Sequence, residues 1–170
     1  IPEIDMPGHA AAALAAYPFL GCTKGPYQTM ETWGVSVESL CAGNDSTYRF
    51  VKDVLDELIE LFPGDMIHIG GDECVKKRWK ECDDCRQKIK QEKLPGEDAL
   101  QDFFVNTVST YLKARGRTAI GWDEVLHKDL PKHARIMSWR GEKGGIDAAR
   151  QGHYVVMSPE SPLYLNHGQS

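Results

Sequence analysis

The sequence predicts an α/β fold with a parallel β-sheet, and three observations lead to this prediction. Short apolar segments alternate along the chain with longer amphipathic segments, the order expected of strand–helix–strand units. A polar or aromatic residue lies at the end of each apolar segment. The chain has 170 residues, 41% of them hydrophobic and 26% charged, which is ordinary for one globular domain with a substantial core.

The first half of the chain is expected to hold two strands and two helices. In order, these are a strand at "IPEID", an alanine-rich helix from about His9 to Tyr17, a long helix in "NDSTYRFVKDVLDELIELFPG" and a strand at "MIHIG". The long helix keeps its apolar residues on one face, and Asn44 or Asp45 can cap it. Residues 18–43 show little periodicity, and a loop of that length in a compact domain usually has a function.

The second half is expected to add two helices, three strands and shorter connections. Residues 76–91 are helical in pattern, and a second helix runs from "LPGED" to Arg115, where Gly116 ends it. The strands are "RTAIGW", "ARIMSW" and "YVVMSP", and "GGIDAARQG" forms a short helical or loop segment before the last of them. The prediction is therefore about five parallel strands with covering helices.

The residues at the strand ends discriminate between two ways of arranging such a sheet. They are Asp5, Asp72 with Glu73, Trp122, Trp139 and the region leading to Tyr164. A (β/α)8 barrel gathers the carboxyl ends of its strands around one pocket, whereas an open, doubly wound sheet spreads them along a line. The sequence therefore favours part of a barrel, because a whole one typically needs about 250 residues.

Charge and motifs exclude several classes of function. The formal net charge of −5 disfavours nucleic acid or an anionic membrane as a partner, since both select basic patches. No apolar run is long enough to span a bilayer. "HIGG" is not a phosphate-binding loop, and no G-x-G-x-x-G follows a strand, so a nucleotide site has no support.

The chain has five cysteines, and an odd number cannot pair completely within one chain. Several pairings remain open. Cys22 and Cys41 flank a polar loop and are able to form a disulfide in an exported protein. Cys82 and Cys85 form a C-x-x-C with Cys74 upstream, which suggests zinc. The second half of a four-ligand set is missing, and two acids lie inside the motif. A local disulfide or free thiols are therefore favoured over a structural zinc, and no metal is expected.

The central motif is "HIGGDE", where two glycines precede the adjacent acids Asp72 and Glu73. Tryptophans near acids suit a sugar, whose ring faces are apolar and whose edges form hydrogen bonds. Glycoside hydrolysis normally uses two carboxyl groups about 5 Å or more apart. Adjacent residues of a strand point in different directions, so this pair is unsuited to that arrangement. It suits a substrate that carries its own nucleophile, such as the carbonyl oxygen of a 2-acetamido sugar.

These motifs resemble glycoside hydrolase family 20, the β-N-acetylhexosaminidases. "HIGGDE" is similar to the family's H-x-G-G-D-E signature, and "PEIDMPGH" resembles its third-strand motif. "GW" at 121–122, "SW" at 138–139 and "YLN" at 164–166 resemble its later strand-end motifs in the same order. The resemblance covers essentially all 170 residues. It implies a single partial catalytic domain over 1–170, roughly strands 3 to 7 of the barrel, without the first two strands and the last.

The resemblance implies a role for each site residue. Glu73 would be the general acid and then the base, Asp72 would orient the acetamido group, and Tyr164 would donate a hydrogen bond to the acetamido oxygen. The expected substrate-binding residues are Asp5, His9, Trp122, Trp139 and Asn166. Of these, His9 lies near Asp5 and supports the acid, the tryptophans wall the pocket, and Asn166 stands where the family usually has Asp. Bare backbone at Gly70 and Gly71 is expected to leave space for the sugar and to allow a sharp turn.

The implied activity is the retaining, substrate-assisted removal of terminal β-linked N-acetylhexosamine, GlcNAc or GalNAc, from glycans or oligosaccharides. No cofactor is required, because the substrate supplies the nucleophile. The parent protein is expected to be exported, and the isolated 170 residues to be inactive and prone to self-association through open barrel edges. The alternatives are a non-catalytic carbohydrate-binding fragment and a metal hydrolase that uses His68, Asp72 and Glu73. Trp33 and Trp79 are assigned to structural packing.

Overall fold

The computed structural model describes residues 1–166, which contain one four-stranded parallel sheet. The strands are β1 (Met66–His68), β2 (Thr118–Trp122), β3 (Arg135–Ser138) and β4 (Val155–Met157). Each strand pairs with the next one along the chain, in the order β1-β2-β3-β4. A doubly wound sheet reverses its strand order at a switch point, whereas a barrel does not. The sheet among these residues is therefore wound as part of a barrel, as predicted.

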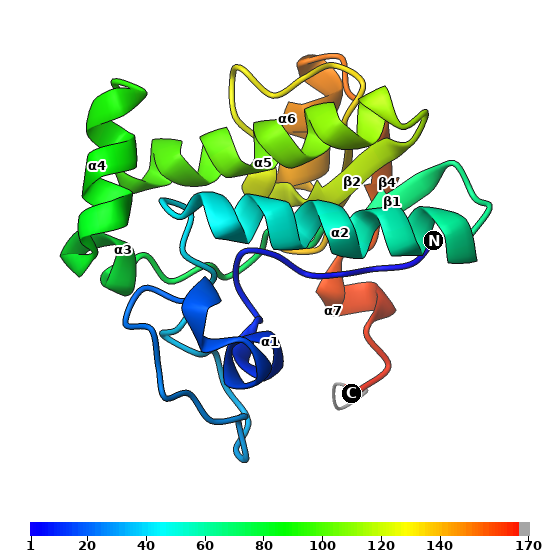
Figure 1. Ribbon diagram of the computed structural model, residues 1–170. Helices are drawn as coiled ribbons and strands as arrows, with labels where there is room; N and C mark the ends of the chain where they lie inside the picture. Colours follow the sequence, from blue (N-terminus) through cyan, green and yellow to red (C-terminus); the bar gives the residue numbers. More distant parts are fainter. Residues whose placement is uncertain (167–170) are drawn as a thin grey trace.

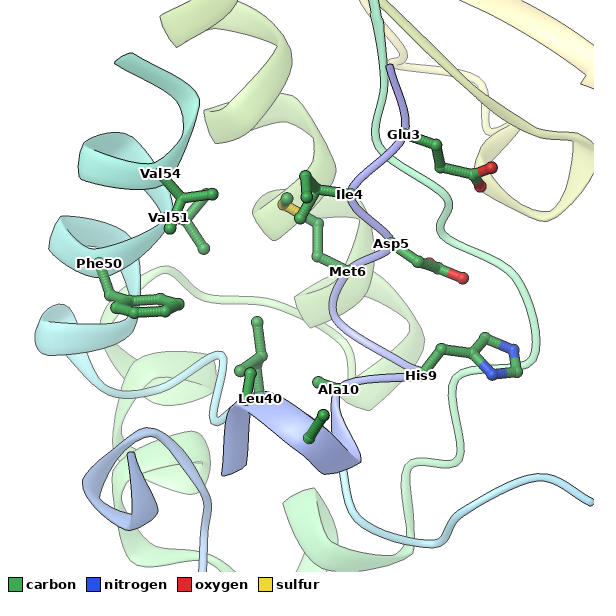
Figure 2. Close-up of a pocket in the computed structure, with 12 residues that line it drawn as sticks. Glu3, Ile4, Asp5, Met6, His9, Ala10, Leu40, Phe50, Val51 and Val54 are labelled. Carbon is green, nitrogen blue, oxygen red and sulfur yellow. The ribbon is translucent and has the colours of Figure 1, made fainter. Parts of the chain in front are cut away.

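The first predicted strand runs beside β1, although only Glu3 and His68 form a β-bridge. The Ile4 N–H donates to the His68 carbonyl at 3.0 Å, and the Met6 N–H donates to the Ile69 carbonyl at 3.0 Å. Side chains alternate along this extended segment. Figure 2 shows Ile4 and Met6 on the side of α2 (Asp45–Leu61), whereas Glu3 and Asp5 point the other way. Met6 on the α2 side is buried in the core and Ile4 is 37% exposed, whereas the opposite face carries the acids.

α2 and α5 (Glu97–Ala114) lie side by side (Figure 1), and α5 packs against β2. α6 (Lys143–Arg150) joins β3 to β4. The remaining helices are α1 (Ala11–Ala16), η1 (Pro18–Leu20), α3 (Lys77–Glu81), α4 (Asp83–Gln91), η2 (Asp123–Val125) and α7 (Glu160–Leu163). The helix expected over 76–91 is broken at Cys82, where α3 ends and α4 begins.

Local signals position these elements. The Asn44 side chain accepts a hydrogen bond from the Ser46 N–H at 2.9 Å, so it is the cap of α2. Trp79 is fully buried and donates from Nε1 to the Leu40 carbonyl at 3.0 Å, as its structural assignment requires. Trp33 is fully exposed instead, so its assignment to packing was wrong. None of the helices within 1–166 combines the length and apolar character that crossing a membrane requires.

Candidate active site

The two adjacent acids lie in a tight turn beyond the end of β1. The backbone φ is +66° at Gly70, +95° at Gly71 and +48° at Glu73, all in the left-handed region. The expectation that strand geometry would turn Asp72 and Glu73 in different directions is therefore wrong, because β1 ends at His68. The turn sets the direction of both side chains.

The two glycines make room for protein atoms, and not for a ligand as the sequence had suggested. A Cβ on Gly70 would lie 1.7 Å from Asp5 Oδ1, and one on Gly71 would lie 2.2 Å from Val125 Cγ1. Both positions also have a φ that favours glycine. The expected sharp turn is present, and it brings the chain into direct contact with Asp5.

His9 links the two acids. Its Nε2 lies 3.4 Å from Asp72 Oδ2 and 3.4 Å from Glu73 Oε2. The Asp72 side chain is 16% exposed and that of Glu73 is 39% exposed. Two carboxylates that are adjacent in sequence therefore converge on one imidazole nitrogen, one of them deep in the site and the other at its surface.

Asp5 lies behind Asp72. Its Oδ1 accepts a hydrogen bond from the Gly71 N–H at 3.0 Å. Burial, together with the negative charge of nearby Asp72, raises the pKa of Asp5 to about 8. Asp72 Oδ1 is buried and has no hydrogen-bond partner among the described residues. A protonated Asp5 is able to donate its O–H to the neighbouring Asp72 carboxylate.

Trp122 is held at the end of β2 by a third acid. Its Nε1 donates to Glu3 Oε1 at 3.1 Å, and its ring lies edge-on to His68 at 4.6 Å between centroids. The same Glu3 oxygen lies 3.0 Å from His68 Nδ1, which also accepts the Gly70 N–H at 3.1 Å. Burial lowers the pKa of His68. His68 therefore supports the strand end and does not join Asp72 and Glu73, against the metal-hydrolase alternative.

Trp139 and Glu73 line the same cavity of about 410 Å³. Trp139 donates from its backbone N–H to Asp123 Oδ1 at 3.0 Å and from Nε1 to Glu124 Oε2 at 3.0 Å. Burial raises the pKa of Glu124. The remaining residues that line the cavity are Gly71, Cys74, Lys76, Gln101, Glu124 and Arg140.

A second cavity, of about 280 Å³, lies between the N-terminal segment, α1 and α2. Figure 2 shows Phe50, Val51 and Val54 of α2 on one side of it and His9 on the other. Its lining is mostly aliphatic, so it offers packing surface and little chemistry.

Tyr164 and Asn166 lie at the end of the described chain. Tyr164 caps α7 and is partly buried. Burial raises its pKa, and so do the nearby carboxylates of Glu160 and Asp72. Asn166 is exposed. The structure thus places Tyr164 within electrostatic reach of Asp72, and Asn166 at the surface.

Comparison with known proteins decides the family. The model of the catalytic domain of glycosyl hydrolase family 20 matches residues 1–170. The chain belongs to glycosyl hydrolase family 20. The β-hexosaminidase of Porphyromonas gingivalis W83 is 50% identical over 170 residues, which are 99% of this chain and 22% of that protein.

Two solved structures of family 20 proteins resemble the chain closely. The β-N-acetylhexosaminidase of Bacteroides fragilis NCTC 9343 has a TM-score of 0.88 and 42% identity, over 99% of this chain and 34% of its own. The exo-β-N-acetylglucosaminidase of Vibrio harveyi, solved with N-acetylglucosamine, has a TM-score of 0.79 and 30% identity, over 93% of this chain and 25% of its own. The chain therefore spans about a fifth to a third of the proteins that it matches, and its fold is part of the family's barrel.

Some polar residues of this family 20 site were not expected from the sequence. Glu3 holds Trp122, Glu124 holds Trp139, and Arg140 donates from Nε to Asp123 Oδ2 at 2.8 Å. Asp123 and Glu124 follow β2 directly in "GWDE", so the reasoning that singled out Asp72 and Glu73 applied to them as well. Glu3 had no comparable signal, because it lies inside a strand-like segment.

Proposed function

We propose that the protein containing this chain removes terminal β-linked N-acetylhexosamine by a retaining, substrate-assisted mechanism. The convergence of Asp72 and Glu73 on His9 Nε2, with one carboxylate deep and the other at the surface, carries the proposal. Two acids in this arrangement are able to serve two different parts of one sugar. The relatives are named β-hexosaminidase and β-N-acetylhexosaminidase, which supports the same substrate class.

The deep acid is suited to the acetamido group. Asp72 accepts a hydrogen bond from the acetamido N–H and increases the electron density on its carbonyl oxygen. That oxygen attacks the anomeric carbon as the glycosidic bond breaks, and an oxazoline-type ring forms. Tyr164 donates to the same oxygen and stabilises the ring.

The acid at the surface is suited to the leaving group. Glu73 gives its proton to the glycosidic oxygen as that bond breaks, and it then accepts a proton from the water that attacks the anomeric carbon. Opening of the ring restores the acetamido group. Two displacements at one carbon retain the anomeric configuration. His9 orients both carboxylates, while Trp122 and Trp139 wall the sugar pocket.

The test compares two aryl glycosides with the natural full-length protein. Hydrolysis of an aryl β-N-acetylglucosaminide is expected to exceed that of the aryl β-glucoside at least about a thousandfold in kcat/KM, because the glucoside lacks the internal nucleophile. Proton NMR is expected to detect the β-anomer of the sugar first. Equal hydrolysis of both glycosides, or initial release of the α-anomer, would contradict the proposal.

The second candidate is a non-catalytic carbohydrate-binding protein, which the tryptophans alone would permit. Such a protein has no need of the Glu73 carboxyl. Binding of N-acetylglucosamine without hydrolysis by the full-length protein, unchanged in Glu73→Gln, would favour this candidate. Hydrolysis that Glu73→Gln abolishes would exclude it.

A further inference from the structure

Four of the five cysteines meet in space, although they are far apart in sequence. Cys22 lies after η1, Cys41 lies just before α2, and Cys82 and Cys85 lie at the start of α4. Their four Sγ atoms all lie within 4.8 Å of one another. Cys74, the fifth, is not part of this cluster. The sequence had suggested that half of a four-thiol set was missing, and Cys22 and Cys41 supply that half.

The distances between the sulfur atoms fit a metal ion at their centre. They are 3.6 Å for Cys41–Cys85, 3.7 Å for Cys41–Cys82 and 3.9 Å for Cys22–Cys85. A tetrahedral zinc site with Zn–S bonds of about 2.3 Å has S···S edges of about 3.8 Å. Cys41 is about equally far from Cys82 and Cys85, so the geometry selects no pair for a disulfide.

Most of the cysteine cluster is buried, and its surroundings are tightly packed. Cys41 and Cys85 are fully buried, and Cys82 is nearly so. A Cβ on Gly43 would lie 2.2 Å from the carbonyl carbon of Asp84, so the segment after Cys41 packs directly on the C-x-x-C turn.

The positive end of α4 favours negative charge at the cysteine cluster. Cys82 is the N-terminal cap residue of α4, and Cys85 lies in its first turn, where the helix dipole is positive. Lys24, beside the cluster, is paired with Asp84 at 3.1 Å. A zinc ion with four thiolates carries a net charge of −2, which the positive end of the helix offsets in part.

We propose that Cys22, Cys41, Cys82 and Cys85 bind one Zn²⁺ ion as a closed structural site. Binding releases the four thiol protons to solvent and forms four Zn–S bonds, with no change in oxidation state. Four protein ligands leave no position for water or substrate, so the ion serves the fold and not the reaction. The site is independent of the proposed hydrolase activity.

The ion would fasten the long loop of residues 18–43 to α3 and α4. These helices follow directly on the turn that carries Asp72 and Glu73. The ion pair between Arg78 and Glu38, at 2.6 Å, joins the same two segments at a second point. Loss of zinc is therefore expected to loosen the loop and lower Tm, as in other domains whose folding is coupled to a metal.

The first test measures zinc in the natural full-length protein purified without chelator. Elemental analysis is expected to give about one zinc per chain, and X-ray absorption to give four sulfur ligands at about 2.3 Å. Peptide mapping is expected to find the four thiols reduced. Two disulfides among these cysteines, zinc with nitrogen or oxygen ligands only, or reduced protein that takes up no added Zn²⁺ would each overturn the proposal.

Cysteine variants test which residues bind the ion. Cys22→Ser, at the most exposed ligand, is expected to lower zinc affinity at least about tenfold and to reduce Tm, whereas Cys74→Ser is the matched control and keeps the zinc. If Cys22→Ser fails to fold, Co²⁺ replacement in the wild type decides instead. Intense thiolate-to-cobalt absorption with tetrahedral ligand-field bands supports the site, and octahedral bands overturn it. Equal zinc affinity in Cys22→Ser and wild type also overturns it.

Discussion

Asp5 shows how burial and a neighbouring acid change the pKa of one residue. Its carboxyl accepts the Gly71 N–H, and its pKa of about 8 leaves it protonated at neutral pH. The sequence singled out Asp5 as a substrate ligand, but the structure places it against Asp72. Which acid of a pair carries the proton depends on burial and distance, and neither can be derived from residue order.

The raised pKa of Asp5 predicts that the stability of the folded state depends on pH. The pKa of Asp5 rises from 3.8 to about 8 on folding, so the stability that this proton contributes is complete below about pH 4 and is lost as the pH rises through 8. Asp5→Asn keeps a donor and an acceptor but cannot titrate. Tm of the full-length wild type is expected to fall more between pH 5 and pH 9 than Tm of Asp5→Asn. Parallel Tm curves for the two proteins would contradict the assignment.

The role of Glu73 predicts a dependence on the leaving group. In the full-length protein, Glu73→Gln is expected to lower kcat/KM on a disaccharide about 10²- to 10⁴-fold, the usual contribution of a general acid. The loss is expected to be smaller on an aryl glycoside whose phenol leaves without a proton. Glu31→Gln, in an exposed loop, serves as the control. An equal loss on both substrates would argue against proton donation by Glu73.

At the scale of elements, the turn after β1 determines the direction of the acidic side chains in the site. The sequence predicted the order and approximate bounds of the strands and long helices, because apolar periodicity and turn residues are local signals. The direction of Asp72 and Glu73 was not predicted, since it depends on φ at three positions of the turn. The cysteine cluster was missed for a similar reason. Its C-x-x-C is local, but Cys22 and Cys41 approach it only through the folding of a long loop.

The turn predicts unequal effects for two glycines with similar backbone geometry. Gly70 (φ +66°) lies against Asp5, whereas Gly116 (φ +73°) has open space where its Cβ would be. Gly70→Ala is expected to destabilise the folded state by about 2–5 kcal/mol, from backbone strain plus overpacking, and Gly116→Ala by only about 1 kcal/mol. Denaturant unfolding measures both. Similar values for the two variants would show that Asp5 does not restrict the turn.

At the scale of the whole molecule, residues 1–166 form a sheet with two open edges. The N-terminal segment forms one edge and β4 the other. Apolar side chains are exposed near both edges; they are Ile1 and Ile4 at the first, and Val156 and Met157 at the second. The sequence predicted a partial barrel correctly, because the residues at the strand ends indicated one shared pocket.

These edges predict the behaviour of the isolated 170-residue chain. Unpaired strand edges with apolar neighbours recruit other chains, so the isolated chain is expected to self-associate and to hydrolyse aryl N-acetylglucosaminide at a small fraction of the full-length rate. Light scattering after size exclusion, together with the same assay on both proteins, measures this. A monomer with the turnover of the full-length protein would contradict the expectation.

In the proposed mechanism, Asp72 directs the substrate's own acetamido oxygen while Glu73 supplies the proton. The most direct measurement is kcat/KM of the full-length protein on aryl N-acetylglucosaminides whose acetyl group carries zero to three fluorine atoms. Fluorine withdraws electrons from the carbonyl oxygen, so we expect kcat/KM to fall steeply with each added fluorine. A rate that is unchanged across the series would show that this oxygen is not the nucleophile.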